Sequence, residues 1–396
     1  MLPNIVLAEG LRTPFGRLGG ALKECSAVEL GAYAVRRLLE RANIAPREVS
    51  EAYFGSAVLA SSTLVAARQI IIKAGLPPET PSLTVDRACC SSMSAIGLGF
   101  MRTRFQEAEI VLAGGVESCS QTPFLQRQTR WGHKLGDLTI EDPLQFRNPF
   151  TGEPLARVTG LVALEHGVSR DEQDDWAFES HRKYFAALDG GLFTDEVAPF
   201  KIGKGADAET VAADEAPRRS ISRDKLRELP PVYGSPTVTA GNAPGLNDGA
   251  SAALVMSRDA AAARGLDPLC EIVAYVQLAG SLNSSPYLPG DAIAQALAKA
   301  GLDIGDLQLI EINEAFAAMP LVSTKRLANG DAKCLIRLRA ITNTKGGAVA
   351  IGHPTGASGA RLVMTLARGL KQRGGGYGAA AICGGFGQAD AIIVKV

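Results

Sequence analysis

Two adjacent cysteines mark the stretch of sequence with the clearest chemical potential. Residues 85–95 read VDRACCSSMSA, where a strand-like run gives way to a helical pattern, so Cys89 or Cys90 stands at a helix N-terminus. The free N–H groups and partial positive charge there favour a thiolate and can bind a carbonyl oxyanion. We therefore expect a cysteine nucleophile whose pKa is lowered from about 8.5 toward roughly 7. The same residues also fit a packing seam around an inert, buried cysteine.

Other segments carry groups that could act together with this thiol. His353, in IGHPTGASG, is one of four histidines, and the glycines around it let the backbone approach a ligand closely. A Cys–His pair would supply a nucleophile and a base. Cys383 opens another glycine loop, CGGFGQA, while Asn313 and Glu314 end a strand-like run in EINEAFA and are expected to face a cleft. Taken alone, the histidine fits a structural role and the Asn313–Glu314 pair an ordinary strand-end cap.

The composition indicates a large α/β protein without a long-range charge field. Of 396 residues, 46% are hydrophobic and 21% charged, which suits extensive cores in more than one structural unit. Lys+Arg and Asp+Glu both number 41, so we expect no steering toward nucleic acid or a membrane. Seven cysteines without CxxC spacing argue against a disulfide framework or a zinc site. Without a leader-like or bilayer-length apolar run, we expect a soluble, cytoplasmic protein.

The pattern of elements predicts a layered fold. From residue 4, short apolar runs alternate with longer helical periodicity, which is typical of a parallel sheet covered on both faces. Ser26 and Glu29 match a capping box at the start of one helix. Residues 119–249 are richer in charge and proline, contain a second capping box at Ser169 and Glu172, and are interpreted as an inserted loop domain.

The opening pattern restarts near residue 269. CEIVAYVQLAG matches NIVLAEG, and the segment with IGHPTGASGARLVMTL matches the one with VDRACCSSMSAIGLGF. We predict a duplicated α/β unit with residues 1–118 plus 250–268 as the N-terminal half, 119–249 as the loop domain and 269–396 as the C-terminal half. Pseudo-symmetry would let the loops at 86–92 and 343–358 face each other across a site between the halves.

Seven motifs, in order, resemble the thiolase family over essentially the whole chain. They read RTPFGRLGG, VDRACCSSMSA, AGGVESCSQTPF, TVTAGNAPGLNDGA, EINEAFA, NTKGGAVAIGHPTGASGAR and AICGGFGQA. The resemblance implies thiolase-like duplicated βαβαβαββ halves in five layers, α-β-α-β-α, with an inserted loop domain. It also implies an acyl-CoA:acetyl-CoA C-acyltransferase of fatty acid metabolism, β-oxidation included. Such an enzyme cleaves a 3-ketoacyl-CoA with CoA or runs the reverse Claisen condensation.

The resemblance implies roles for individual residues. Cys89 would be acylated, His353 would take its proton, and Cys383 would protonate or form the acetyl carbanion. Asn313, through a water, and His353 would form one oxyanion hole. The backbone N–H groups of Cys89 and Gly385 would form the other.

Coenzyme A is expected along the loop domain, as substrate and carrier, with no metal or redox cofactor. Arg218 matches the family position that packs on the adenine, a role suited to a planar guanidinium. Its charged surroundings also fit a solvated surface. Ala243 and Pro244 lie in the motif that meets the pantetheine arm, where Pro244 replaces a serine. No nucleic acid or membrane partner is expected, and related enzymes imply a homodimer or homotetramer.

Further positions depart from the family pattern. Asp86 replaces the usual Asn, and a carboxylate beside Cys89 opposes thiolate formation unless it is neutralised, for which Arg87 is the candidate. Cys90 and Ser92 replace the customary smaller residues beside the nucleophile. Cys90 could compete for modification, although the register of the motif points to Cys89.

Two more changes concern the acyl pocket. Ser285 replaces a methionine that helps close this pocket in the family, and Phe386 replaces a glycine. Together they change the shape of the pocket rather than only its volume. We therefore expect the enzyme to accept acyl chains beyond acetoacetyl, with branched and cyclic chains as candidates.

Two other functions stay open from the sequence. A catalytically degenerate thiolase-like subunit would bind acyl-CoA or a partner without turnover, which the changes at Asp86, Ser92 and Pro244 would allow. A ketoacyl-synthase-like condensing enzyme shares the fold and the cysteine. It would pair Cys89 with two histidines, or with a histidine and an asparagine, whereas Cys383 and EINEAFA follow the thiolase pattern.

Overall fold

A computed structural model describes residues 2–58, 64–203 and 208–396. Its large sheet is built from the following strands: β1 (Ile5–Arg12), β2 (Gly16–Arg17), β3 (Glu51–Gly55), β4 (Ser82–Val85), β5 (Ile110–Ser118), β10 (Asn247–Ser257), β11 (Cys270–Ala279), β12 (Leu307–Ile312), β13 (Tyr377–Gly384) and β14 (Gln388–Lys395). Their hydrogen-bonded order is β12-β13-β14-β11-β1-β10-β5-β3-β4, with β2 paired to β10.

The strand pairing shows the duplication directly. In the N-terminal half, β3 runs parallel to β4 and β5, and β10 runs antiparallel to β5 and β1. In the C-terminal half, β12 runs parallel to β13, and its Ile310 forms an isolated parallel bridge with Thr342. The strand β14 runs antiparallel to β13 and β11. The two halves meet where Val6 and Leu7 of β1 pair with Glu271 and Cys270 of β11.

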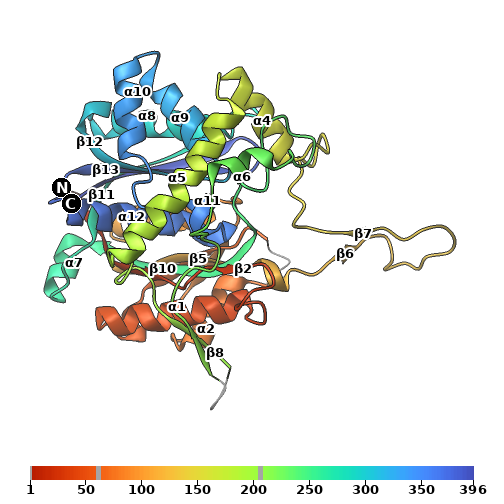
Figure 1. The fold of residues 1–396 in the computed structure, drawn as a ribbon. Helices are drawn as coiled ribbons and strands as arrows, with labels where there is room; N and C mark the ends of the chain where they lie inside the picture. The colour runs from red at the N-terminus through yellow and green to blue at the C-terminus, as the bar shows by residue number, and fades with distance from the viewer. Residues whose placement is uncertain (1, 59–63, 204–207) are drawn as a thin grey trace.

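Helices cover both outer faces and fill the space between the halves. The helices of these layers are α1 (Ala27–Ala42), α2 (Ala66–Ala74), α3 (Ser91–Arg104), α8 (Leu288–Ala300), α9 (Ala318–Ala328), α10 (Ala332–Ile341) and α12 (Thr355–Gln372). In Figure 1, α1 and α2 lie below the N-terminal strands, α12 lies in the middle, and α8 to α10 lie above the C-terminal strands. This layer order confirms the predicted α-β-α-β-α fold.

The middle layer holds the two halves together. Nearly every residue of α12 is buried, as expected for a helix enclosed on all sides. One hydrophobic cluster joins Met93 of α3 and Met364 of α12 to strand residues of both halves, such as Val111 and Ile392. Because both helices begin at the same side of this layer, their N-terminal loops meet there.

The contact between α3 and α12 leaves no room for larger residues. A Cβ atom on Gly359 of α12 would lie 2.6 Å from the backbone nitrogen of Met93. The Ser92 hydroxyl accepts a hydrogen bond from the Ala360 N–H at 2.9 Å. Ser92 therefore fits its position by bonding to the partner helix, which accounts for a serine where the family pattern has glycine.

The segment between β5 and β10 forms separate elements beside this core. They are β6 (Leu125–Gln126), β7 (Ile140–Glu141), α4 (Leu155–Glu165), α5 (Arg170–Asp189), β8 (Phe200–Ile202), β9 (Glu209–Val211) and α6 (Arg223–Glu228). Figure 1 shows β6 and β7 on a long arm that projects from the body. The boundaries proposed for the loop domain remain a prediction.

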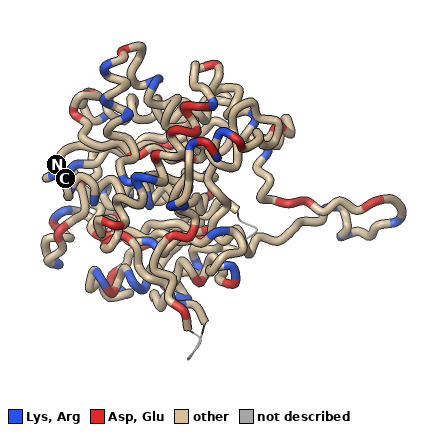
Figure 2. The backbone as a smooth tube through the Cα atoms, in the orientation of Figure 1, with Lys and Arg blue, Asp and Glu red and all other residues tan. Residues whose placement is uncertain are grey.

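Local sequence signals set the helix starts. Both predicted capping boxes are present, with Ser26 and Glu29 at α1 and Ser169 and Glu172 at α5. Figure 2 shows acidic and basic residues interspersed along the backbone of the body and the arm, in line with a formal net charge of zero. Among the helices of the described residues, none is long and apolar enough to cross a bilayer.

The helix contact yields a stability prediction. Gly359→Ala should lower the free energy of unfolding by about 1–3 kcal/mol, because the new methyl group meets backbone rather than a movable side chain. Gly305, which has nothing within 4 Å of a built Cβ, is the matched control. Gly305→Ala should change stability by less than about 0.5 kcal/mol. Thermal unfolding of both variants checks this prediction. If Gly359→Ala were as stable as Gly305→Ala, the tight contact between the helices would be contradicted.

Candidate active site

The loop that carries the first cysteine is a strained turn between β4 and α3. Ala88 has a φ of +50°, in the left-handed region that residues with a Cβ rarely adopt. Its N–H donates to Asp86 Oδ1 at 3.0 Å, and its carbonyl accepts from the Ser91 hydroxyl at 2.6 Å. The Ser91 hydroxyl also accepts from the Arg87 N–H at 2.9 Å. These bonds hold the strained backbone, and the next residue, Cys89, lines a cavity.

His353 reaches the same cysteine from the C-terminal half. It lies between α11 (Ala348–Ile351) and α12. Its backbone N–H donates to Asn247 Oδ1 at 2.9 Å. Its Nε2 lies 3.2 Å from Cys89 Sγ and 3.3 Å from Asn313 Nδ2. The predicted meeting of the two N-terminal loops is therefore present in the structure.

A serine one turn into α12 determines which nitrogen of His353 carries the proton. The Ser358 hydroxyl lies 2.7 Å from Nδ1 and 3.0 Å from the Pro354 carbonyl oxygen. A hydroxyl has one proton, and a carbonyl oxygen can only accept, so the bond to Pro354 uses the proton of Ser358. With Ser358 bonded in this way, Nδ1 is the N–H that donates to Ser358, and the lone pair of Nε2 faces Cys89.

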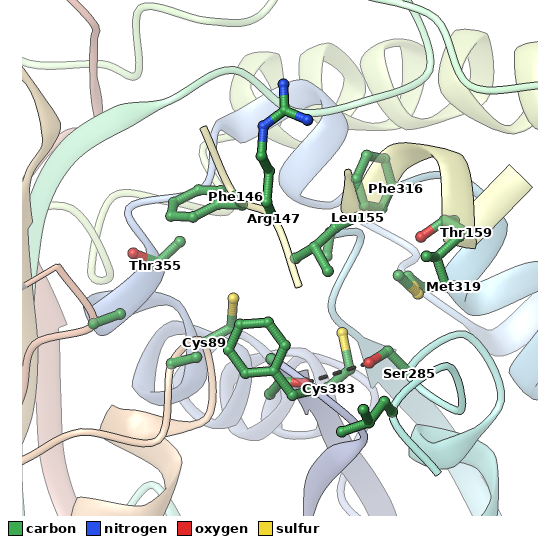
Figure 3. Close-up of a pocket in the computed structure, with 18 of the residues that line it drawn as sticks. Cys89, Phe146, Arg147, Leu155, Thr159, Ser285, Phe316, Met319, Thr355 and Cys383 are labelled. Carbon is green, nitrogen blue, oxygen red and sulfur yellow. Dashed lines mark hydrogen bonds between the residues drawn. The ribbon is translucent and has the colours of Figure 1, made fainter. Parts of the chain in front are cut away.

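The second cysteine shares the cavity with the first. Cys383 ends β13, and it lines a cavity of about 430 Å³ together with Cys89 and Gly385. In Figure 3 the sulfurs of Cys89 and Cys383 both point into this space, with Phe316 and Met319 on one side. Neither His353 nor Asn313 is among the described residues that line the cavity; His353 adjoins it through its contact with Cys89, and Asn313 through its contact with His353.

Burial keeps the reacting groups neutral. It raises the pKa of Cys89 well above the usual value, and the nearby Cys383 and Glu117 raise that pKa further. Burial also raises the pKa of Cys383 to about 12. For His353, burial and then Arg361 lower the pKa to about 3. The predicted lowering of the thiol pKa was therefore wrong, because desolvation outweighs the helix N-terminus.

Comparisons with known proteins agree with this geometry. A family model described as the thiolase N-terminal domain matches residues 5–259, and one described as the thiolase C-terminal domain matches residues 266–396. The chain belongs to the thiolase family. The predicted family is confirmed.

Relatives match this thiolase sequence along its whole length. It is 38% identical to a probable acetyl-CoA acetyltransferase of Mycolicibacterium smegmatis, over 98% of this chain and 100% of the relative. It is 37% identical to the human mitochondrial 3-ketoacyl-CoA thiolase, over 100% of this chain and 99% of the relative.

Solved structures match it closely as well. The crystal structure of the Bacillus anthracis acetyl-CoA acetyltransferase superposes with a TM-score of 0.94 at 34% identity, covering 100% of this chain and 99% of that one. The human mitochondrial 3-ketoacyl-CoA thiolase in complex with CoA superposes with a TM-score of 0.93 at 37% identity, covering 99% of this chain and 98% of that one.

Arg87 does not neutralise Asp86 as predicted. Its guanidinium pairs with Asp390 of β14 and donates to Ser94 Oγ at 3.0 Å. Asp390 is fully buried and also accepts from Tyr275 Oη at 2.9 Å. The nucleophile loop of one half is thereby fastened to a strand of the other, through a residue 303 positions away.

Two further predictions about polar residues need correction. Glu314 does not face a cleft; it accepts from Trp176 Nε1 at 2.8 Å and Ser180 Oγ at 2.9 Å, which ties β12 to α5. Cys90 is fully buried in the core, with its sulfur 3.4 Å from the Ile382 carbonyl oxygen. Cys90 is therefore a poor competitor for modification, and the cavity exposes Cys89 instead.

The residues predicted to bind CoA lie apart from the two cysteines. Arg218 is exposed, and its backbone N–H donates to His181 Nδ1 at 3.1 Å. Ala243 and Pro244 are half-buried. None of the three is among the described residues that line the cavity.

Sequence reasoning missed several groups that shape the site. Ser358 and Asn247 orient His353, and Met319 lines the cavity, so a methionine is present although Ser285 replaces the expected one. His353 precedes the N-cap of α12, and Ser358 lies one turn into that helix. This spacing was the one sequence signal that could have pointed to Ser358. Met319 gave no signal, because its position depends on how α9 packs.

The Arg87–Asp390 contact predicts a kinetic effect. Asp390→Asn should lower kcat by about 10–100-fold, because a small displacement of Cys89 is enough to misalign the attack. Glu9→Gln is the matched control, since Glu9 pairs with Arg368 at 2.8 Å and also joins the two halves. It should lower thermal stability without changing kcat. Equal kcat losses in both variants would show that Asp390 acts only on folding.

The pKa of Cys89 predicts how its reactivity depends on pH. Because the thiol pKa is raised, the thiolate fraction is small at neutral pH and grows as pH increases. Alkylation of Cys89 by iodoacetamide should therefore accelerate continuously from about pH 6 to about pH 9. Labelling quantified by mass spectrometry, with Cys89→Ala as the blank, measures this. A plateau below about pH 7 would mean that the thiol is already ionised.

Proposed function

We propose that this chain is an active acyl-CoA:acetyl-CoA C-acyltransferase that cleaves 3-ketoacyl-CoA with CoA, or runs the reverse condensation, through an acyl-Cys89 intermediate. The observation that carries the proposal is the 3.2 Å contact of Cys89 Sγ with His353 Nε2 beside a cavity shared with Cys383. A thiol, a base and a second proton donor in one site match the needs of this reaction.

In the first half-reaction, Cys89 Sγ attacks the 3-keto carbon and its proton moves to His353 Nε2. The bond between C2 and C3 then breaks, and the Cys383 thiol protonates the carbanion of the departing acetyl-CoA. The acyl group stays on Cys89 as a thioester. At this point Cys383 is a thiolate and His353 is an imidazolium.

In the second half-reaction, CoA gives its thiol proton to Cys383 and attacks the acyl thioester. Cys89 leaves and recovers its proton from His353, so all groups return to their starting state. A thiol with a pKa of about 12 forms a strongly basic thiolate, which suits removal of an acetyl α-proton in the reverse direction. The cycle needs no metal or redox cofactor, and CoA is a substrate.

Two oxyanion holes complete the proposal. Once protonated, His353 Nε2 becomes a donor, and Asn313 lies beside it at 3.3 Å. The backbone N–H groups of Cys89 and Gly385 form the second hole, supported by the place of both residues on the cavity. Arg218, Ala243 and Pro244 are proposed to hold the CoA, on the family pattern.

The alternative functions fit the geometry less well. A degenerate subunit would not need Cys89, His353 and Cys383 gathered at one site. A ketoacyl-synthase-like enzyme would use Cys89, His353 and Asn313, which do lie together, but it would not need the second thiol, Cys383, on the same cavity.

Assembly and location are part of the same proposal. We propose a homodimer or homotetramer, supported by the arm, where Trp131 and Leu135 are 90% and 94% exposed, and by β4, which ends the strand order. A cytoplasmic location is supported by the seven cysteines, all free thiols. The human relative is mitochondrial by name.

The proposal predicts a covalent intermediate. Incubation with acetyl-CoA should place an acetyl group on Cys89, and free CoA should remove it. Mass spectrometry of the peptide measures the adduct. Cys89→Ala should show none, whereas Cys383→Ala should keep the adduct but lose exchange of the acetyl-CoA methyl protons with deuterated water. If the wild-type protein forms no adduct, the binding-subunit alternative is favoured.

A further inference from the structure

Phe386 has a backbone conformation that aromatic residues rarely adopt. It is the middle residue of the tight loop between β13 and β14, where Gly384 pairs with Gln388. Its φ is +62°, in the left-handed region. A bulky residue there is strained, whereas glycine is not. Such an outlier persists only where its surroundings hold it.

The loop is held on both sides. A Cβ on Gly384 would lie 2.9 Å from the Arg87 carbonyl oxygen and 3.0 Å from Cys90 Sγ. One on Gly387 would lie 2.1 Å from the Ser281 carbonyl oxygen. In addition, the Gly280 N–H donates to the Gly387 carbonyl at 2.7 Å. The backbone of Phe386 therefore cannot relax by moving toward the Arg87–Cys90 loop on one side or toward Ser281 on the other.

The side chain of Phe386 serves the cavity rather than the core. It is half-buried, and it belongs to none of the hydrophobic core clusters formed by the described residues. It does line the cavity that holds Cys89 and Cys383. The strain at Phe386 is thus not offset by core packing, and its consequence lies in the shape of the cavity.

Apolar side chains form most of the cavity lining. The loop segment contributes Phe146, Leu155 and Val158, and the C-terminal half contributes Leu282, Pro286, Phe316, Met319 and Phe386. In Figure 3, Phe316 and Met319 lie on the side of the cavity near Ser285.

Two charged residues also line the cavity. They are Asp86 of the nucleophile loop and Arg147 at the base of the arm. The guanidinium of Arg147 points away from the two sulfurs in Figure 3. A hydrocarbon chain attached to a carbonyl at Cys89 would thus lie against an apolar lining to which Phe386 contributes.

We propose that Phe386 is a specificity-determining residue whose ring contacts the acyl chain and makes 3-ketoacyl-CoA with chains longer than acetoacetyl the preferred substrates. This inference rests on the proposed function. The strained loop holds the ring in place before substrate arrives, so the contact requires no ordering of a flexible side chain. A longer chain covers more of this apolar lining than the acetoacetyl group does, and so gains more from the ring.

Two substitutions at this position separate selectivity from folding. Phe386→Ala and Phe386→Gly both remove the ring, but only glycine also relieves the left-handed backbone. In both variants, the ratio of kcat/KM for 3-ketooctanoyl-CoA to that for acetoacetyl-CoA should fall by about 10-fold or more. The Gly variant should melt about 1–3 °C above the Ala variant, which keeps a folded variant available for the assay.

Tyr233 supplies the matched control, because it also has a positive φ, +52°, but is 63% exposed. Tyr233→Ala and Tyr233→Gly should differ in melting temperature in the same sense and leave the substrate ratio unchanged. An unchanged or increased ratio in both Phe386 variants would overturn the inference. If the wild-type protein cleaved neither substrate, the proposed function itself would fail, which is a distinguishable result.

Discussion

The close contact between α3 and α12 is the constraint on which the site depends. The two helices occupy equivalent places in the duplicated halves, and they meet in the middle layer through Ser92, Gly359 and Ala360. Their N-terminal loops consequently converge, which places Cys89 3.2 Å from His353. Nucleophile and base are separated by 264 positions in the chain. Only the packing of the two halves brings them together.

The second consequence of this packing is that the site is desolvated. Moving a thiol and an imidazole away from water disfavours the ion pair, which favours the neutral forms of both groups before substrate binds. Reactivity then comes from contact: the lone pair of Nε2 is already aimed at Sγ, and the proton moves as the new bond forms. Ser358 contributes by fixing the tautomer, and the Arg87–Asp390 pair by holding the loop that carries Cys89.

The sequence predicted the features that repeat or have a local signal. The duplicated halves, both capping boxes and the facing loops followed from periodicity and from motifs, and the structure contains them. The direction of the Cys89 pKa shift could not be predicted, because it depends on how much protein surrounds the sulfur. The partner of Arg87 lies on β14 and gives no signal near residue 87. The backbone strain at Phe386 also arises only once its neighbours are packed.

The most direct test of this account is the protonation state of His353 in the free enzyme. The chain has four histidines, so ¹⁵N-labelled histidine with a His353→Gln variant for assignment makes its ring resolvable by NMR. The account predicts a neutral ring at pH about 7, with the proton on Nδ1 and none on Nε2, unchanged in Cys89→Ala. An imidazolium that becomes neutral when Cys89 is removed would instead show a thiolate–imidazolium pair and contradict the account.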